Sequence, residues 1–146
     1  METQSNTNLE KNNIKLNFKD AMYATGRRKK SIARVWVKKG SGVININGKK
    51  MQDYFKKASL QISINRPFTL AQRENQYDVN CSVKGGGLTG QAGAIVHGLA
   101  RALVKFEPDI KPTLKKEKLT TRDSRSVERK KFGHRKARRS FQFSKR

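Results

Sequence analysis

The sequence predicts an α+β two-layer sandwich with a disordered N-terminal lead-in and a long, extended, basic C-terminal tail. Three observations lead to this prediction. Runs of alternating apolar and polar residues indicate strands, one longer run with apolar residues at helical spacing indicates a helix over the sheet, and the end of the chain shows neither pattern. The boundaries follow as 1–21 for the lead-in, 22–119 for a globular α/β domain and 120–146 for the tail.

The lead-in begins with a polar segment at residues 1–20, METQSNTNLEKNNIKLNFKD. It lacks the apolar run of a secretory signal, and its acidic residues and absence of Arg are untypical of a transit peptide. A segment of this composition cannot bury enough apolar surface to offset the entropy cost of ordering. We therefore expect it to be disordered.

The first predicted strand is at residues 31–37, SIARVWV, where every second position after Ser31 is Ala or Val. Turn residues follow at 39–42, Lys-Gly-Ser-Gly, and alternation resumes at Ile44 and Ile46. Two alternating runs joined by such a turn are typical of a β-hairpin. We expect these two segments to pair with each other.

The next segment, residues 51–72, MQDYFKKASLQISINRPFTLAQ, is predicted to be helical in parts, with an interruption where Arg66 precedes Pro67. The residue before a proline is sterically disfavoured in the helical conformation. A third strand is predicted at 77–83, YDVNCSV, because its apolar residues alternate with polar ones over the whole run.

A long helix is predicted at residues 89–106, where apolar residues recur at spacings of three and four. Glu107 before Pro108 predicts its end. Residues 109–119 hold enough apolar residues for a short docking helix. The order of strand, strand, helical piece, strand and helix fits a sheet covered on one face by the long helix.

Charge is the dominant feature of the composition: 34 Lys and Arg against 11 Asp and Glu give a formal net charge of +23. Two blocks hold most of it, 25–67 with 12 basic residues and one acidic residue, and 109–146 with 15 basic and four acidic residues. This excess is far beyond what solubility requires of a small domain. A polyanion is the expected partner.

Residues that could carry catalysis or bind a metal are few. Cys81 is the single cysteine, which excludes an intramolecular disulfide and is typical of a reducing compartment. His97 and His134 have no partner at metal-ligand spacing, and His97 is expected to be exposed with Arg101 and Lys105 on the polar side of the helix. No catalytic residue, metal, cofactor, small-molecule substrate or membrane-spanning helix is predicted.

Residues 85–90, GGGLTG, have the spacing of a dinucleotide-binding loop between a predicted strand and a predicted helix. The context argues against that function, because such a site needs a second apolar strand ending near an acidic residue, and Pro108 and a Lys-rich stretch follow instead. Two alternatives stay open. The glycines could form a tight strand-to-helix turn, or the backbone amides could contact an RNA phosphate.

Residues 26–31, GRRKKS, lack the ending of a phosphate-binding P-loop. Their four consecutive cations lie close in sequence to Arg34, Lys38 and Lys39, with no neighbouring acid to balance them. A cation run is often a solvated surface, but this clustering favours contact with phosphate.

The last residues, 129–146, RKKFGHRKARRSFQFSKR, hold nine Lys or Arg and no acid, with Gly133 and three phenylalanines between the cations. No apolar repeat gives this segment a core face. Such a composition is typical of a chain that stays extended and folds onto RNA.

Three long blocks of the sequence resemble one known family. They are residues 23–37, YATGRRKKSIARVWV, residues 85–103, GGGLTGQAGAIVHGLARAL, and residues 121–146, TRDSRSVERKKFGHRKARRSFQFSKR. Together they are similar to the ninth protein of the small ribosomal subunit, in its bacterial or mitochondrial form. The resemblance spans about residues 22 to 146.

The resemblance implies the fold of the second domain of ribosomal protein S five, including a left-handed βαβ crossover, and a structural role in translation without enzymatic activity. It implies that residues 22–119 bind the 3′ major domain of small-subunit rRNA in the head, beside neighbouring head proteins. The tail is then expected to reach the anticodon stem-loop of peptidyl-site tRNA.

Site residues follow from the resemblance by position and from the clustering of charge. The residues expected to bind rRNA are Arg27, Arg28, Lys29, Lys30, Arg34, Arg122, Arg125, Arg129, Lys130, Lys131, Arg135 and Lys136. The residues expected to contact tRNA are Arg138, Arg139, Ser144, Lys145 and Arg146.

The chain departs from this family just before the tail. Where the family commonly has a glycine and two apolar residues, this chain has Lys118, Leu119 and Thr120. A glycine there would end the preceding helix through a left-handed residue. The departure bears on that helix end and not on the tail.

We expect a bacterial, cytoplasmic ribosome, because the lead-in lacks transit-peptide features, with the mitochondrial matrix as the alternative. Two other classes of function are compatible with the residues alone. A stand-alone RNA or DNA chaperone would share the charge, and a nucleotide-dependent enzyme would use the glycine turn.

Overall fold

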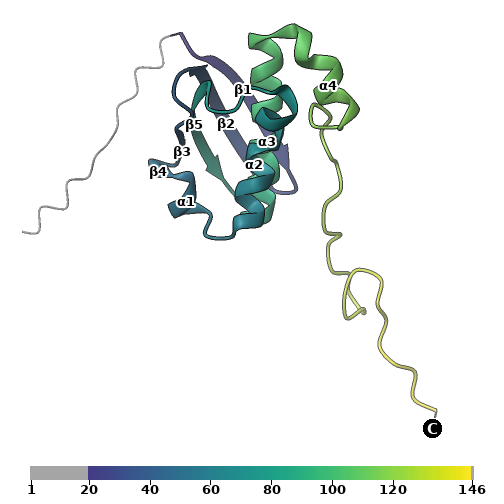
Figure 1. Cartoon of the computed structure of the whole chain (residues 1–146). Helices are drawn as coiled ribbons and strands as arrows, with labels where there is room; N and C mark the ends of the chain where they lie inside the picture. The colour runs from purple at the N-terminus through teal and green to yellow at the C-terminus, as the bar shows by residue number, and fades with distance from the viewer. Residues whose placement is uncertain (1–19, 146) are drawn as a thin grey trace, which may run out of the picture.

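The computed structural model describes residues 20–145, and the predicted lead-in lies almost wholly outside them. Within the described part, helices pack on one face of a five-stranded sheet (Figure 1). The elements are β1 (Met22–Arg28), β2 (Ser31–Lys39), β3 (Ile44–Ile46), β4 (Lys49–Lys50), α1 (Met51–Tyr54), α2 (Ala58–Ala71), β5 (Tyr77–Lys84), α3 (Leu88–Phe106), the 3-10 turn η1 (Pro108–Ile110) and α4 (Lys111–Lys116). This arrangement confirms the predicted α+β class.

The strands form one mixed sheet in the order β1-β2-β5-β3-β4. β2 pairs antiparallel with β1 on one side and with β5 on the other, while β3 pairs parallel with β5 and antiparallel with β4. The predicted hairpin between residues 31–37 and 44–46 is therefore wrong, because β5 lies between them. β5 is buried at Tyr77, Val79 and Val83, and this apolar strand takes the central position.

The sequence does not predict β1, because MYATGRR lacks a clear apolar alternation. The strand nevertheless pairs with β2 from Met22 opposite Val37 to Arg28 opposite Ser31. Ala24 and Gly26 are its two buried residues. Pairing with a strongly apolar neighbour and contact with α3 therefore determine this strand, rather than its own propensity.

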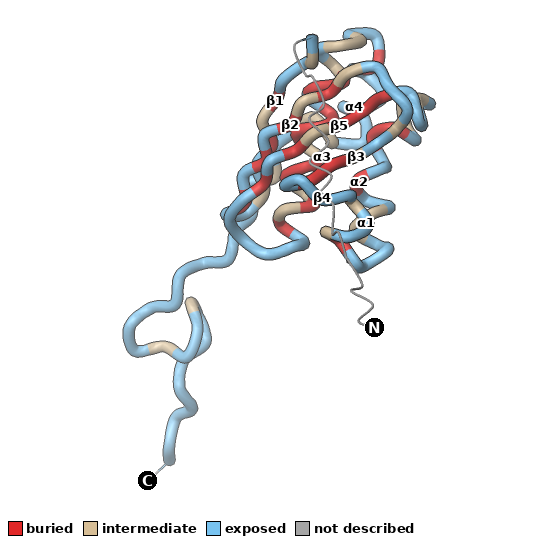
Figure 2. The backbone as a smooth tube through the Cα atoms, turned by 90° about the vertical axis from the view of Figure 1, so that its left-hand side faces the viewer, coloured by how far each residue is buried: buried red, intermediate tan, exposed pale blue. Residues whose placement is uncertain are grey.

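α3 covers the sheet by contacting β1 and β2, and its residues Ile95, Leu99 and Leu103 are fully buried in the core. Figure 2 shows buried residues gathered along the strands of the sheet. The prediction of a helix at 89–106 is confirmed to within one residue, and its end at Glu107 is also confirmed. Gly26 of β1 lies against Gly98 of α3, and a Cβ on Gly26 would clash with the α3 backbone. Two glycines thus allow the helix to approach the strand closely.

α2 runs through Pro67, so the predicted interruption at Arg66-Pro67 is wrong. A proline inside a helix removes one hydrogen bond and crowds the preceding turn. Ile64, Pro67 and Phe68 are all buried, and the apolar surface that they remove from water offsets that cost.

The predicted docking helix is present as η1 and α4, which bury Ile110 and Leu114. After α4 the chain turns at Lys118, whose φ of 57° is in the left-handed region. The N–H of Lys118 donates to the Lys115 carbonyl at 2.9 Å, and the N–H of Leu119 donates to the Leu114 carbonyl at 3.0 Å. This is a Schellman motif, in which Lys118 takes the left-handed position that is usually occupied by glycine.

Asp78 holds the loop between β2 and β3. It is 8 % exposed, and its Oδ1 accepts the backbone N–H groups of Ser41, Gly42 and Val43 at 2.9 to 3.0 Å. Burial opposes ionisation of this carboxyl, but the backbone N–H donors outweigh it and hold the pKa of Asp78 below its usual value. The loop that the sequence suggested as a hairpin turn is therefore a loop anchored on β5.

Replacing Asp78 with Ala is expected to lower the free energy of unfolding by about 2 kcal/mol at pH 7, because three backbone donors lose their acceptor. Since the folded pKa lies below the ordinary value, this contribution is fully present above the unfolded pKa of about 4 and is lost as pH falls through the folded value. Denaturant unfolding of both chains between pH 7 and pH 3 measures it. Asp109→Ala, at an exposed position, is the control, and an equal loss in both variants would contradict the role of Asp78.

Candidate nucleic-acid interface

The cation run at Arg27–Lys30 forms the tip of the β1–β2 hairpin. Lys29 and Lys30 make its two-residue turn, with Lys29 in the left-handed region at φ 52°. Arg27, Lys29 and Lys30 are exposed, whereas Arg28 is half-buried, with its aliphatic stem beside Gly93 of α3. The turn thus presents three cations to solvent and directs the fourth toward the helix layer.

Arg28 connects this turn to the start of the tail, which is distant in sequence. Its Nη1 lies 2.6 Å from Asp123 Oδ2 and donates to the Arg125 carbonyl at 3.4 Å. Asp123 also accepts hydrogen bonds from the Arg125 side chain. These hydrogen bonds, and to a smaller extent the positive charge of Arg28, hold the pKa of Asp123 well below its usual range. The expectation that no acid balances the run is therefore wrong for Arg28, whose partner comes from almost a hundred residues away.

His97 lies at the same junction and is half-buried, so the prediction that it is exposed is wrong. Its Nδ1 accepts the backbone N–H of Arg27 at 3.2 Å, and the backbone of Thr120 also hydrogen-bonds to the ring. Burial, followed by the positive charges of Arg101 and Arg122, lowers the pKa of His97. The neutral ring therefore joins β1, α3 and the start of the tail.

The polar stripe of α3 covers the outer edge of β1. Arg101 donates to the Thr25 carbonyl at 2.7 Å, and Lys105 donates to the Tyr23 carbonyl at 2.9 Å. Together with the contact of His97 to Arg27, they form a row along the strand. Side chains spaced four apart on a helix thus bind successive backbone groups of an edge strand, which blocks pairing with another strand. The sequence predicts this polar stripe, but it does not predict β1, whose backbone the stripe binds.

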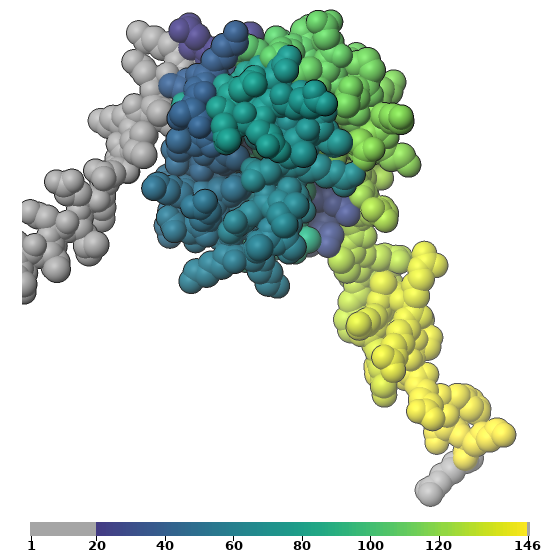
Figure 3. All heavy atoms as spheres, in the orientation of Figure 1, coloured from purple at the N-terminus to yellow at the C-terminus, as the bar shows by residue number. Residues whose placement is uncertain are grey.

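The tail leaves this junction and runs away from the domain (Figures 1 and 3). From Thr120 to Lys145 it contains no helix or strand, and the β-bridge in this range joins His134 to Ser140. The Arg135 N–H donates to the Arg139 carbonyl at 2.7 Å, and the Arg135 guanidinium lies 5.5 Å from the centre of the Phe141 ring. A small cationic loop at 134–140 therefore interrupts the expected extended course.

The cations and aromatic rings of the tail are exposed together. Phe132, Phe141 and Phe143 are 101, 61 and 85 % exposed. The exposed predicted site residues here are Arg122, Arg125, Arg129, Lys130, Lys131, Arg135, Lys136, Arg138, Arg139, Ser144 and Lys145, while Arg146 lies outside the described residues. Arg138 forms an ion pair with Glu128 at 3.0 Å. Exposed rings between cations suit a partner that offers both phosphate and stacking surfaces.

The predicted site residues do not all share one surface. The structure brings the turn at 27–30 together with Arg122 and Arg125, because Arg28 and His97 hold the tail start there. The residues from 129 onward lie farther along the tail (Figure 3). Arg34 lies on the exposed side of β2, above the rings of Tyr23 and Trp36.

The glycine turn at 85–90 has a structural cause. Gly85 and Gly86 have φ of 80° and 61°, and Cβ atoms there would clash with the Lys30 carbonyl and the Ser31 hydroxyl. Ser31 Oγ donates to the Gly85 carbonyl at 2.9 Å. Since η1 and α4 follow α3 where a dinucleotide fold needs a strand, the structure supports the reading as a tight turn.

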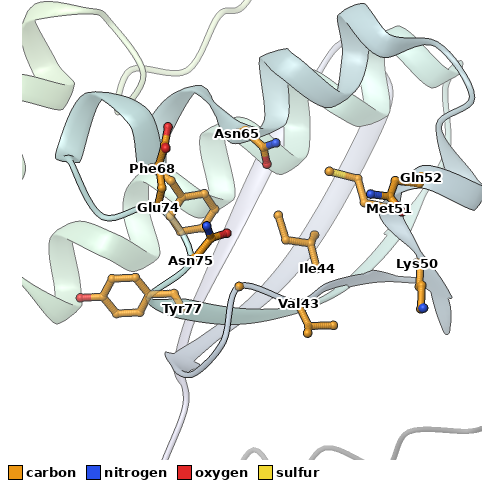
Figure 4. Close-up of a pocket in the computed structure, with 11 residues that line it drawn as sticks. Val43, Ile44, Lys50, Met51, Gln52, Asn65, Phe68, Glu74, Asn75 and Tyr77 are labelled. Atoms are coloured by element: carbon orange, nitrogen blue, oxygen red, sulfur yellow. The ribbon is translucent and has the colours of Figure 1, made fainter.

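A hollow of about 470 Å³ lies between the β3–α1 segment and α2, and no residue of the glycine turn lines it (Figure 4). Ile44, Met51, Phe68 and Tyr77 line it together with polar side chains. Cys81 is buried on β5, and burial raises the pKa of its thiol to about 12, far from that of a nucleophile. In residues 20–145 no group of three His, Cys, Asp or Glu side chains is placed to hold a metal ion.

No helix within the described residues is both long and apolar enough to cross a bilayer.

The chain matches a known protein family. The family model of ribosomal protein S9/S16 matches residues 26–146, from the end of β1 through the tail. The match includes the turn, α3 and the exposed cationic segment described above. The chain therefore belongs to the ribosomal protein S9/S16 family and is a structural, non-enzymatic protein of the small ribosomal subunit.

Proposed function

We propose that this protein binds the 3′ major domain of small-subunit rRNA in the head and extends residues 120–146 to the anticodon stem-loop of peptidyl-site tRNA. The observation that carries the proposal is the junction of the β1–β2 turn with the tail. There Arg27, Lys29 and Lys30 are exposed beside a tail start that Arg28 and Asp123 fasten to the domain. Exposed cations thus lie on both sides of this junction, on the folded domain and on the tail.

The tail can carry charge into a gap that a folded domain could not enter. The last eighteen residues, 129–146, span roughly 55 to 60 Å when fully extended. This length requires the loop at 134–140 to open. Ordering each residue costs on the order of 1 to 2 kcal/mol of backbone entropy. Dense phosphate contacts with release of counterions can offset that cost, so we expect the tail to be disordered off the ribosome.

Different residues serve different parts of this proposal. The cations of the turn and of the tail up to Lys136 would contact rRNA phosphates, with neighbouring head proteins nearby. Arg138, Arg139, Ser144, Lys145 and Arg146 would lie at or near the tRNA. Contacts to the phosphate backbone carry no sequence information, so such a tip would accept every tRNA.

Family membership places the protein in ribosomes, either in the cytoplasm or in the mitochondrial matrix. We propose the bacterial cytoplasm. A fold like the second domain of ribosomal protein S five, with a left-handed crossover from β3 to β5, belongs to the same proposal. The parallel pairing of β3 with β5 and the helices between them supply the crossover.

A chain ending at Ser144 tests the tRNA contact. Small subunits containing it are expected to assemble normally but to bind peptidyl-site tRNA roughly tenfold more weakly. The reason is that two charges are lost, and each exposed charge contact contributes about 0.5 to 1 kcal/mol. Filter binding of tRNA and a frameshift reporter measure the effect. Lys115→Gln with Lys116→Gln removes two charges from α4 as a control, and unchanged tRNA binding by the shortened chain would refute the tip contact.

Sedimentation separates this function from that of an RNA chaperone. The full chain in a cell lysate is expected to migrate with the small subunit and with whole ribosomes, and to stay there at high salt. A chaperone would bind many RNAs and move to the light fractions as salt screens its contacts.

A further inference from the structure

Within residues 20–145, α3 covers one face of the sheet over β1 and β2, and no helix covers the opposite face there, which we call the bare face. Along β2, Ala33, Val35 and Val37 are fully buried on the helix side, and Ile32, Arg34 and Trp36 lie on the opposite side. Directly opposite residues in antiparallel strands share a face. The register therefore adds residues of β1 and β5 to this bare face, which is defined here by Tyr23, Arg27, Ile32, Arg34, Trp36 and Lys84.

An aromatic and cationic cluster lies on the bare face. Tyr23 and Trp36 are opposite each other across β1 and β2, with ring centres 5.2 Å apart. The Arg34 guanidinium lies 5.0 Å from the Trp36 ring centre and 5.8 Å from that of Tyr23. These contacts hold the guanidinium on the rings while its N–H donors remain available.

The cluster is accessible and positively charged. Tyr23 is 39 % and Ile32 is 42 % exposed, and Arg34 is exposed as well. No carboxylate of residues 20–145 forms an ion pair with Arg34. Asp78 is the acid in register on this side, and its Oδ1 is occupied by the loop at 41–43. A polyanion complements such a surface.

We propose that the bare face is a second RNA-binding surface, where an unpaired nucleobase stacks on the cluster of Tyr23, Arg34 and Trp36. The proposal rests on the proposed function and names the RNA element that the domain binds. Arg27 and Lys84, which flank Ile32 in the register, supply charge for the adjoining phosphates. Paired bases are stacked inside a helix, whereas unpaired bases can stack on aromatic rings and guanidinium planes.

Trp36 is the single tryptophan of the chain, so its fluorescence reports on this surface alone. The probe is a ten-nucleotide oligoadenylate, added to the full chain at moderate salt, beside a fully paired RNA duplex of the same length. Anisotropy of each labelled RNA measures total binding, to which the tail contributes. We expect both RNAs to bind and only the single-stranded RNA to quench Trp36.

Arg34→Gln is expected to weaken the oligoadenylate binding seen by Trp36 quenching about tenfold, within the range found for single stacking contacts. Lys56→Gln, which removes an exposed charge elsewhere, should leave quenching unchanged. Arg34 is exposed, so the variant is expected to fold, and a thermal melt checks this. Binding by anisotropy without Trp36 quenching would overturn this inference and leave the proposed function intact, whereas failure of both RNAs to bind would contradict both.

A photocrosslinker in place of Trp36 tests the same surface in assembled small subunits. A crosslink from this position to rRNA would support the inference. A crosslink to a neighbouring protein instead would overturn it, because the face would then be a protein interface.

Discussion

A chain that ends at Thr120 is expected to bind small-subunit rRNA on the order of a thousandfold more weakly than the full chain at moderate salt. The removed segment carries eleven Lys and Arg against two acids. Each phosphate contact that releases a counterion steepens the dependence of log affinity on log salt by slightly less than one unit. The slope should therefore flatten by several units, which filter binding over a salt series measures.

The domain itself should survive this truncation. Ile110 and Leu114 are buried, Leu119 packs against the core, and the lost ion pair between Arg28 and Asp123 is partly exposed. A full-length chain with Phe132, Phe141 and Phe143 changed to Ser is the control for charge, because it keeps every cation. We expect this control to retain the salt slope, and a truncated chain with an unchanged slope would show that the tail makes no phosphate contacts.

Gly26→Ala is expected to lower the free energy of unfolding by about 1 to 3 kcal/mol, the usual cost of inserting a methyl group into a packed core. The new Cβ would clash with the Ala94 carbonyl and with the backbone of Gly98, neither of which is a flexible side-chain end. α3 would have to move away from β1. Denaturant unfolding measures the loss.

Gly87→Ala is the matched control, because a Cβ there meets nothing within 4 Å. We expect a smaller loss, about 0.5 to 1 kcal/mol, because Gly87 is the N-cap of α3 and Ala is less favourable than Gly at that position. Hydrogen exchange of the β1 amides adds a second measurement, since separation of α3 from β1 would expose the strand edge that His97, Arg101 and Lys105 now cover. Equal stability of the two variants would contradict the close contact of Gly26 with α3.

Local patterns gave the secondary structure where each pattern was complete. The strands at 31–37 and 77–83, the helix at 89–106 and the docking helix after Pro108 were all predicted, because their apolar residues follow a single period. Pro67 shows the limit of such local rules. Its steric cost is real, but burial of the same proline in the core outweighs it, and a local rule does not include burial.

The candidate site was predictable as a set of cations but not as a surface. Clustering of cations in the sequence identified residues 27–30 and the tail. It did not predict that Arg28 contacts Asp123 or that His97 connects β1 to Thr120. The contacts of Arg28 with the tail start and of His97 with Arg27 join residues separated by 70 or more positions. Sequence spacing says nothing about pairs that meet only when helix and sheet pack.

The sequence by itself determined the class of partner, the helix-over-sheet layering and the cationic tail, because charge and apolar period are properties of neighbouring residues. The tertiary structure decided the position of β5 between β2 and β3, the capped edge of β1, the fastening of the tail and the bare face with Trp36. Each of these depends on which strand lies beside which. Strand order is set by competition among all strands for burial, so it emerges only when the whole chain is packed.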